Sequence, residues 1–382
     1  MPATGDKSRA AGGARAPALE VVAVRPPLAG FFSKRCTAHC GVPVLAHQCV
    51  ADAALVKAAS RVDAALRRLP GVAQRLVFLG TSVQVIGATQ LTTDLPQYAH
   101  IHANPDEADA FNARGRGYGG LCPSCAEENL LLLPSDRFAD HRDICTHELA
   151  HTILDWGFPP AKAQALKAAC EAVRAKSAAA GRWKAAYAAT NADEFFAECA
   201  MWVMGSRGDG GAITQPPVEP GPRWLAAHDP DASRFMHTVL AGKWKWHGDS
   251  RDQDADVITD VVPLHADDAL SFSPSGNTPP CLLVVVNETD TPLTLTWLDQ
   301  NGAATVYGTT PPWCSSGQAT FVGHVWRLSA AAGDGQQHDI GVFAACPGTG
   351  RVRVTKTRRR RSKRTRAAAQ GWTLPWEAHD DA

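Results

Sequence analysis

The feature that most constrains this chain is the six-residue stretch Thr146–His151, which reads Thr-His-Glu-Leu-Ala-His. Two histidines four residues apart lie on one face of a helix, because four residues slightly exceed one turn of about 3.6. A divalent metal ion needs ligands that converge from one side, and two neutral imidazoles at this spacing supply them. Glu148 lies about 100° round the helix from His147, where it can reach a metal-bound water without binding the metal. The stretch therefore predicts a helix that carries a metal site.

The residues around this stretch predict an amphipathic helix with one face left free. At about 100° per residue, the apolar side chains of residues 143–156 gather on one side, and the two histidines, Glu148 and Asp155 gather on the other. Gly157 is a suitable end for this helix. The pattern His-Glu-x-x-His (HExxH) is that of zinc hydrolases, in which the Glu is the general base. A chance match on a surface helix is the alternative, because short motifs carry false positives.

A second helix is predicted to supply the third metal ligand. A zinc site for hydrolysis has three protein ligands and one open position. The predicted helix at residues 191–204 carries Glu194 and Glu198, which are four residues apart and share a face. Aromatic residues flank both, so we expect this helix to be buried, and buried carboxylates need a metal or a hydrogen-bond donor. A solvated pair of carboxylates is the alternative.

A resemblance to a known enzyme family rests on this second helix and the residues before it. The matching residues are Tyr187, Thr190, Asn191, Glu194, Phe195, Phe196, Ala197 and Glu198. They resemble the catalytic domain of anthrax lethal factor and its relatives, gluzincin-type zinc metallopeptidases that include the Pro-Pro endopeptidases. The resemblance covers residues 110–205.

The resemblance implies a role for each residue of the site. In that family a Glu of this helix is the third zinc ligand, a role that falls on Glu194. A Glu one turn later supports a histidine ligand and matches Glu198. A Tyr seven residues before the ligand donates to the developing oxyanion and matches Tyr187. The resemblance thus implies a zinc metalloendopeptidase that binds Zn²⁺ through His147, His151 and Glu194, with Glu148 as the catalytic base.

The chain changes character after an acidic segment at residues 249–256, where we place a linker. From residue 280 to residue 354, short β-branched runs alternate with turns such as Asn301-Gly302, as is typical of an all-β domain. The expected organisation is a disordered leader at 1–30, an α+β metallopeptidase domain with the HExxH helix at 31–248, an all-β sandwich at 256–354 and a basic disordered tail at 355–382.

The β region carries a second resemblance. The matching residues are Val286, Asn287, Trp297, Leu298, Asn301, Gly302, Tyr307, Pro311, Pro312, Gly323, His324, Val325 and Trp326. They resemble the β domain of the von Hippel–Lindau tumour suppressor (VHL), whose pocket binds 4-hydroxyproline. The resemblance implies a peptide-binding pocket formed by Trp297, Tyr307, Thr320, His324 and Trp326, in which the threonine stands for a serine of the family. The alternative is a sandwich core of aromatic side chains in which the histidine is structural.

The segments between these motifs give a coarser prediction. Residues 114–120 contain four glycines, and we expect them to form an edge strand beside the metal, with which a substrate pairs. Residues 76–79 and 127–133 are predicted as strands, and residues 50–69 and 161–180 as helices.

Eleven cysteines in 382 residues do not require a disulfide framework. The spacing of Cys36 and Cys40, and of Cys122 and Cys125, fits either a structural zinc site or two disulfide bridges. Free thiols are the third alternative.

Composition excludes some partners. The formal net charge is zero, with 38 basic and 38 acidic residues, so no overall field favours nucleic acid. No run approaches the roughly 18 apolar residues of a membrane span, and residues 1–30 lack the apolar core of a secretory signal. We expect an intracellular protein, in the cytoplasm or nucleus, with secretion by a non-classical route as the alternative.

The sequence therefore predicts a zinc metalloendopeptidase with an appended recognition module. Its expected partner is a protein or peptide substrate. If both resemblances hold, the substrate is proline-rich or prolyl-hydroxylated and is held by the β domain while the zinc site cuts nearby. The rival hypothesis is a non-catalytic hydroxyproline-peptide binding protein, in which the β domain carries the function.

Overall fold

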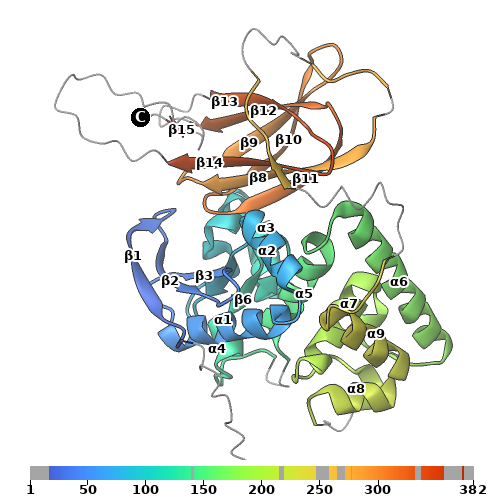
Figure 1. Cartoon of the computed structure of the whole chain (residues 1–382). Helices are drawn as coiled ribbons and strands as arrows, with labels where there is room; N and C mark the ends of the chain where they lie inside the picture. The colour runs from blue at the N-terminus through green and yellow to red at the C-terminus, as the bar shows by residue number, and fades with distance from the viewer. Residues whose placement is uncertain are drawn as a thin grey trace, which may run out of the picture.

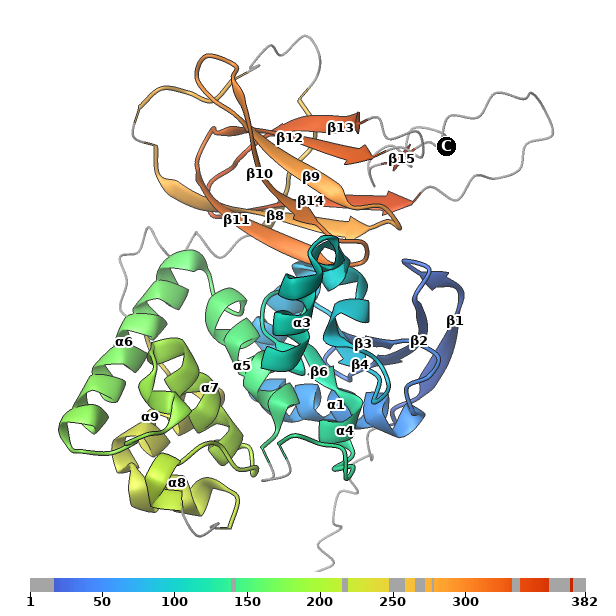
Figure 2. The same cartoon turned by 180° about the vertical axis from the view of Figure 1, so that it is seen from behind.

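The computed structural model describes residues 17–138, 142–214, 219–246, 258–264, 272–276, 278–331, 337–356 and 372–373. The described chain has two parts: an N-terminal part (17–246) with one sheet and the described helices, and a β part (258–356 together with 372–373) with two sheets (Figures 1 and 2). The chain is thus a mixed helix and sheet protein, compatible with the expected α+β class. In the part of the chain that is described, no helix combines the length and apolar character needed to cross a membrane.

The N-terminal part is built on a mixed six-stranded sheet. Its strands are β1 (Val21–Leu28), β2 (Phe32–Thr37), β3 (Pro43–Ala46), β4 (Val83–Ile86), β5 (Gly117–Tyr118) and β6 (Ser124–Ala126). They follow the order β1-β2-β3-β4-β6-β5, in which the pairs β3–β4 and β4–β6 are parallel. Strand β4 is buried along its whole length, as expected for a parallel strand covered on both faces. Strand β5 lies at the edge of the sheet.

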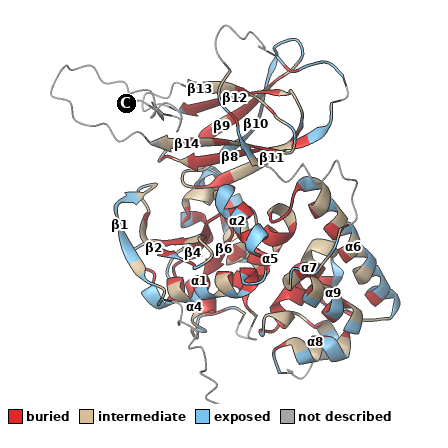
Figure 3. Ribbon diagram, in the orientation of Figure 1, coloured by how far each residue is buried: buried red, intermediate tan, exposed pale blue. Residues whose placement is uncertain are grey.

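Helices surround this sheet and continue beside it. They are α1 (Asp52–Leu66), α2 (Pro70–Phe78), η1 (Thr92–Asp94), η2 (Pro96–Ala103), α3 (Pro105–Arg114), α4 (Glu127–Leu130), α5 (Ile144–Trp156), α6 (Pro160–Ala179), η3 (Tyr187–Ala189), α7 (Ala192–Val203), η4 (Gly211–Thr214), α8 (Pro222–His228) and α9 (Pro230–Leu240). Both views place α5 between the sheet and the group α6–α9 (Figures 1 and 2). A single core cluster joins Leu55 of α1, Leu149 of α5 and Phe196 of α7. All three helices carry buried residues (Figure 3).

The β part consists of two sheets that face each other. Its strands are β7 (Ile258–Asp260), β8 (Pro280–Glu288), β9 (Leu293–Leu298), β10 (Ala304–Thr310), β11 (Ser315–Phe321), β12 (Val325–Ala331), β13 (Gln337–Ala344), β14 (Thr349–Lys356) and β15 (Trp372–Thr373). One sheet has the order β10-β9-β12-β13, and the other runs β11-β8-β14-β15, with β7 on β14. Leu283 and Val352 of one sheet meet Leu328 and Phe343 of the other in a shared core.

The β part packs directly on the N-terminal part through β8 and β11. Leu79 and Leu121 form a small buried cluster with Val284 and Val286 of β8. Polar contacts flank this cluster: Arg75 Nη2 donates to Thr349 Oγ1 over 3.0 Å, Ser315 N donates to Cys122 Sγ over 3.3 Å, and Gln84 Nε2 donates to Cys314 Sγ over 3.1 Å. The two parts therefore share a buried interface.

Two of the predicted strands are wrong. Residues 76–79 belong to α2 and the turn after it, because Pro70 begins this second helix as well as following α1. Residues 127–133 form α4 and a turn, and the strand lies just before them, at β6. The apolar pattern missed that Glu127 is buried and accepts hydrogen bonds from Ala51 N (2.7 Å) and Ala88 N (2.9 Å).

The predicted leader and tail are also wrong in part. Residues 21–28 form β1, which pairs with β2, so this stretch of the predicted leader belongs to the sheet. At the other end, Thr355 and Lys356 belong to β14 and pair with β15. Residues 1–16, the linker predicted at 249–256, and residues 357–371 and 374–382 of the tail lie outside the described residues.

Candidate metal centre

Helix α5 carries the HExxH residues, and its ends are set by local sequence. Asp143 caps the first turn, with Oδ1 accepting the Thr146 N–H over 3.1 Å, and its other oxygen pairs with Arg61 over 2.6 Å. Leu149 and Ile153 are about 1% exposed and hold one face of the helix in the core. The opposite face, with both histidines and the glutamate, lines a cleft of about 590 Å³.

Helix α7 brings the predicted third ligand to this cleft. It begins after Asn191, whose side-chain oxygen accepts the Glu194 N–H over 2.8 Å, close to the predicted start of this helix. Phe195 and Phe196 are fully buried in the core of the N-terminal part. Their burial fixes the rotation of α7, so that Glu194 and Glu198 face α5.

Three ligand atoms converge where the two helices meet. Glu194 Oε2 lies 3.1 Å from His147 Nε2 and 3.3 Å from His151 Nε2, and the two Nε2 atoms are 3.1 Å apart. Glu194 Oε2 is buried, and the two imidazole nitrogens are its close polar neighbours. Three lone-pair atoms held this close in a buried place suit a cation. The trio could hold a metal ion, and it is the only such group of His, Cys, Asp or Glu found among the described residues.

Glu198 supports the first histidine from behind. It is 2% exposed, and its Oε1 lies 3.2 Å from His147 Nδ1. Burial lowers the pKa of His147, but the carboxylates of Glu194 and Glu198 outweigh it and raise that pKa to about 10. For Glu194, burial raises the pKa of the carboxyl group. The two histidines have the larger combined effect and lower this pKa well below its usual range. Without a metal, the site therefore holds a proton between its imidazoles and carboxylates.

Glu148 and Tyr187 line the cleft beside the trio. Burial raises the pKa of Glu148, and the neighbouring histidines offset only part of that rise. The Tyr187 hydroxyl donates to Glu194 Oε1 over 3.1 Å, and 43% of the residue is exposed. Burial and the Glu194 charge raise the pKa of Tyr187, so its hydroxyl stays protonated and can donate. The cleft thus contains a carboxylate base and a phenol donor next to the possible metal position.

The glycine-rich segment forms the wall of the cleft opposite α7. As predicted, it contains the edge strand, β5. A Cβ on Gly117 would lie 2.6 Å from Ile144 Cγ2, and one on Gly119 would lie 3.0 Å from His151 Cβ. Side chains at these two positions would therefore push the strand away from α5, and glycine lets the backbone approach the site closely.

One residue of the site, Asp209, was missed by the sequence reasoning. It follows α7, and no spacing rule connects it to the metal ligands. Asp209 Oδ2 accepts the Tyr187 N–H over 2.8 Å, and its own N–H donates to Glu198 Oε2. It therefore ties the tyrosine to the carboxylate that supports His147. Its glycine neighbours in the sequence indicate only a turn.

The cysteines are free thiols in the structure. Cys36 and Cys40 lie on and after β2, whereas Cys122 contacts Cys314 of the β part, and Cys125 contacts Cys145 of α5. They form neither of the two predicted bridges. They also form no metal-ligand group within the described ranges of the chain.

The five residues predicted for the β pocket lie together. Trp326 is opposite Trp297 on paired strands, and Trp326 Nε1 donates to Thr320 Oγ1 over 3.1 Å. The Tyr307 ring is 5.1 Å from the Trp326 ring, and the His324 ring is 5.5 Å from the Trp297 ring. Trp326 is only 2% exposed and belongs to the core, whereas Tyr307 is 51% exposed. Burial lowers the pKa of His324, which favours its neutral form.

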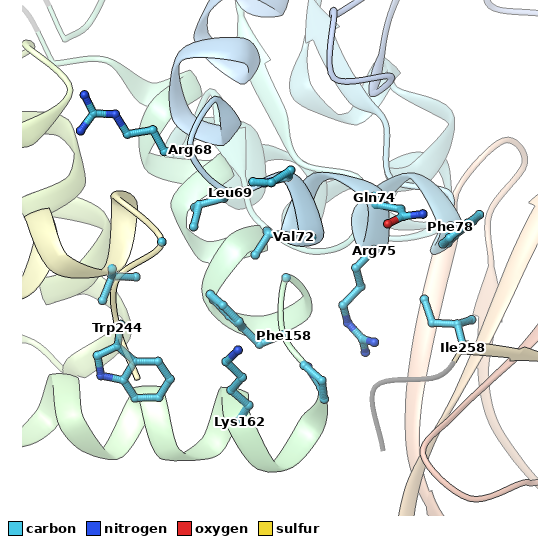
Figure 4. Close-up of a pocket in the computed structure, with 16 residues that line it drawn as sticks. Arg68, Leu69, Val72, Gln74, Arg75, Phe78, Phe158, Lys162, Trp244 and Ile258 are labelled. Atoms are coloured by element: carbon cyan, nitrogen blue, oxygen red, sulfur yellow. The ribbon is translucent and has the colours of Figure 1, made fainter. Parts of the chain in front are cut away.

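A second hollow, also of about 590 Å³, lies between α2, the start of α6 and β7 (Figure 4). Lys162 lies beside Phe158, with its Nζ 5.3 Å from the ring centroid, and Arg75 extends from α2 nearby (Figure 4). The described residues that line this hollow include no His, Cys, Asp or Glu. It therefore lacks the imidazole, thiolate and carboxylate ligands that a zinc site needs, which favours the other cleft as the metal site.

Comparison with known protein families and with curated proteins finds no match for this chain. The functional interpretation therefore rests on the chemistry and geometry of the cleft and on the sequence motifs.

Proposed function

We propose that the protein is a zinc metalloendopeptidase of the anthrax lethal factor type. The observation that carries the proposal is the triangle formed by His147, His151 and Glu194, whose ligand atoms are 3.1–3.3 Å apart. Bonds of about 2.0–2.1 Å in a tetrahedral site put neighbouring ligands roughly 3.3–3.4 Å apart. The spacing of the three ligand atoms therefore fits three neighbouring ligands of a tetrahedral zinc site, which these residues would hold.

The ligand set favours zinc over other divalent ions. Two imidazoles and one carboxylate are a usual set for catalytic zinc, whereas magnesium and calcium prefer sites made wholly of oxygen ligands. Zinc bound in such a site activates a water molecule for attack and polarises the carbonyl that is attacked.

Three residues of the cleft would assist the reaction: Glu148 by proton transfer, Tyr187 by stabilising negative charge, and Glu198 by orienting a ligand. Glu148 accepts a proton from the attacking water and passes it to the leaving amine. The raised pKa of Glu148 makes it a better proton acceptor in this role. The Tyr187 hydroxyl donates to the oxyanion that develops on the scissile carbonyl. Glu198 orients the ring of His147 through Nδ1 and makes it a better ligand.

The β part is a candidate recognition module for hydroxyproline-containing segments. Support comes from its resemblance to the VHL β domain and from the clustering of Trp297, Tyr307, Thr320, His324 and Trp326. Trp297 Nε1 is also buried without a hydrogen-bond partner among the described residues, and a ligand hydroxyl would satisfy such an atom. If this module alone carries the function, the protein is a non-catalytic binder. Titrating the full chain with matched proline and hydroxyproline peptides tests the module, and equal binding of both would exclude it.

Metal removal and reconstitution test the proposed activity. The purified protein is stripped with a chelator and incubated with a mixture of peptides, and cleavage is followed by mass spectrometry. Zinc is expected to restore cleavage of internal peptide bonds, and magnesium or calcium is not. A metal-saturated protein that cleaves no peptide of a diverse library would contradict the proposal.

A further inference from the structure

The edge strand β5 runs in the same direction as α5 along the cleft. The start of the strand, at Gly117, lies against Ile144 in the first turn of the helix. Gly119 lies against His151, about two turns further along, and Thr152 Oγ1 donates to Gly120 O over 2.7 Å. The cleft therefore has two distinct ends, one at the N-terminus of α5 and one toward its C-terminus.

The two ends of the cleft carry opposite charges. Arg114, Arg116 and Arg142 line the end where α5 begins. That end also receives the positive end of the α5 dipole. Asp155 and Asp193 line the other end, where Lys167 lies 2.5 Å from one carboxylate and 3.1 Å from the other. One lysine between two carboxylates leaves that end negative.

Arg114 is the cation at the positive end that is available to a ligand. Arg116 is bound to Glu128 over 2.6 and 2.9 Å, and Arg142 lies 3.7 Å from Asp209. Arg114 is exposed at the end of α3 and makes no ion pair within the described ranges. Arg114 lines the cleft together with His147, Glu148 and Tyr187.

The free edge of β5 sets how a peptide would lie between these ends. An extended peptide that adds to a sheet edge satisfies the unpaired N–H and C=O groups of that edge. Antiparallel pairing is slightly the more stable arrangement. A peptide antiparallel to β5 would place its N-terminal flank near Gly120 and its C-terminal flank near Arg114.

We propose that this enzyme selects substrates with an acidic residue on the C-terminal side of the scissile bond, and that Arg114 determines this selectivity. The inference rests on the proposed peptidase function and adds a substrate class to it. A carboxylate two or three residues after the cleaved bond pairs with the Arg114 guanidinium, which suits carboxylates geometrically. Because the pair is exposed, the preference is about twofold to fivefold over a neutral residue. It weakens as the salt concentration rises.

The test uses a set of peptides that share one cleavable sequence and differ in one residue. Glu, Gln or Lys is placed two or three residues after the cleaved bond, and kcat/KM is measured for each with the zinc-loaded full chain. The expected order is Glu above Gln above Lys. Arg114→Glu is expected to reverse this order, and Arg114→Gln to flatten it. Arg35→Glu is the matched control, because Arg35 is exposed on β2, which β3, β4 and β6 separate from β5.

The outcomes separate this inference from the proposed function. If no peptide of the set or of a diverse library is cut, the peptidase function itself fails. If peptides are cut at equal rates with Glu and Lys, or if Arg114→Glu leaves the order unchanged, only the role of Arg114 fails. An acidic preference on the N-terminal side of the cleaved bond would overturn the antiparallel docking. Binding of the same peptides to the Glu148→Gln protein, measured by fluorescence anisotropy, gives the same ranking without turnover.

Discussion

Replacing Gly317 by alanine should destabilise the contact between the β part and the helix that carries the metal site. Gly317 lies on β11 and faces Trp156, the last residue of α5. A Cβ at this position would lie 2.3 Å from Trp156 Cζ3 and 2.6 Å from Cη2. Carbon atoms in ordinary contact are about 3.5–4.0 Å apart, so the ring or the strand has to move by more than about 1 Å.

The expected cost follows from two opposing effects. Forcing an extra methyl group into a packed site costs about 1–3 kcal/mol. Replacing glycine by alanine also restricts the unfolded chain, and this stabilises the folded protein by about 0.4–1 kcal/mol. The free energy of unfolding of Gly317→Ala should therefore fall by up to about 2.5 kcal/mol, and should lie about 1–3 kcal/mol below that of a glycine-to-alanine change without a steric clash.

Urea unfolding of the full chain, followed by tryptophan fluorescence and circular dichroism, measures this change. Gly308→Ala is the matched control: it also lies in a strand of the β part, and a Cβ there would have no atom within 4 Å. The control should be unchanged or slightly more stable. If Gly317→Ala were as stable as Gly308→Ala, β11 would not press on α5 as the structure has it, and the packing argument would be refuted.

The metal site gives three further predictions. Glu194→Ala should sharply lower zinc content measured by atomic emission, since it removes one of three ligands, and full retention of zinc would place the third ligand elsewhere. Tyr187→Phe should lower kcat by about 10²–10³, as for loss of one oxyanion donor, with zinc content unchanged; an unaltered kcat would remove that role. Zinc affinity should rise with pH, by up to about tenfold per unit between about pH 6 and pH 8. The reason is that the raised pKa of His147, about 10, leaves a proton on this ligand that zinc must displace. A competition titration with a chromophoric chelator checks this pH dependence, and an affinity independent of pH would contradict it.

Those parts of the site that depend on neighbours in the sequence could be predicted. The spacing of His147 and His151 determines their shared face, and Asn191 marks the start of the helix that carries Glu194. These features follow from the geometry of a single helix and its cap. The close approach of α5 and α7 could be predicted only from the resemblance and from the expected burial of the aromatic residues around Glu194.

Features that arise from packing between distant segments could not be predicted. Asp209 joins Tyr187 to Glu198 across a loop, and no local pattern marks such a partner. Residues 127–133 have the composition of a strand, but the hydrogen bonds that Glu127 accepts from two other segments stabilise a helical turn there. Tertiary contacts override local preference at such positions. The charge difference between the cleft ends likewise depends on which arginines find partners in the fold.

The central claim is that Glu148 acts as the base in a zinc-dependent hydrolysis, and one comparison tests it directly. Peptide cleavage is measured for the parent protein and for Glu148→Gln at equal zinc occupancy. The change removes the base and keeps the shape and all three ligands, so zinc binding should persist while kcat falls by at least about 10²-fold. Cleavage by Glu148→Gln at the parent rate, with zinc fully bound, would contradict the account.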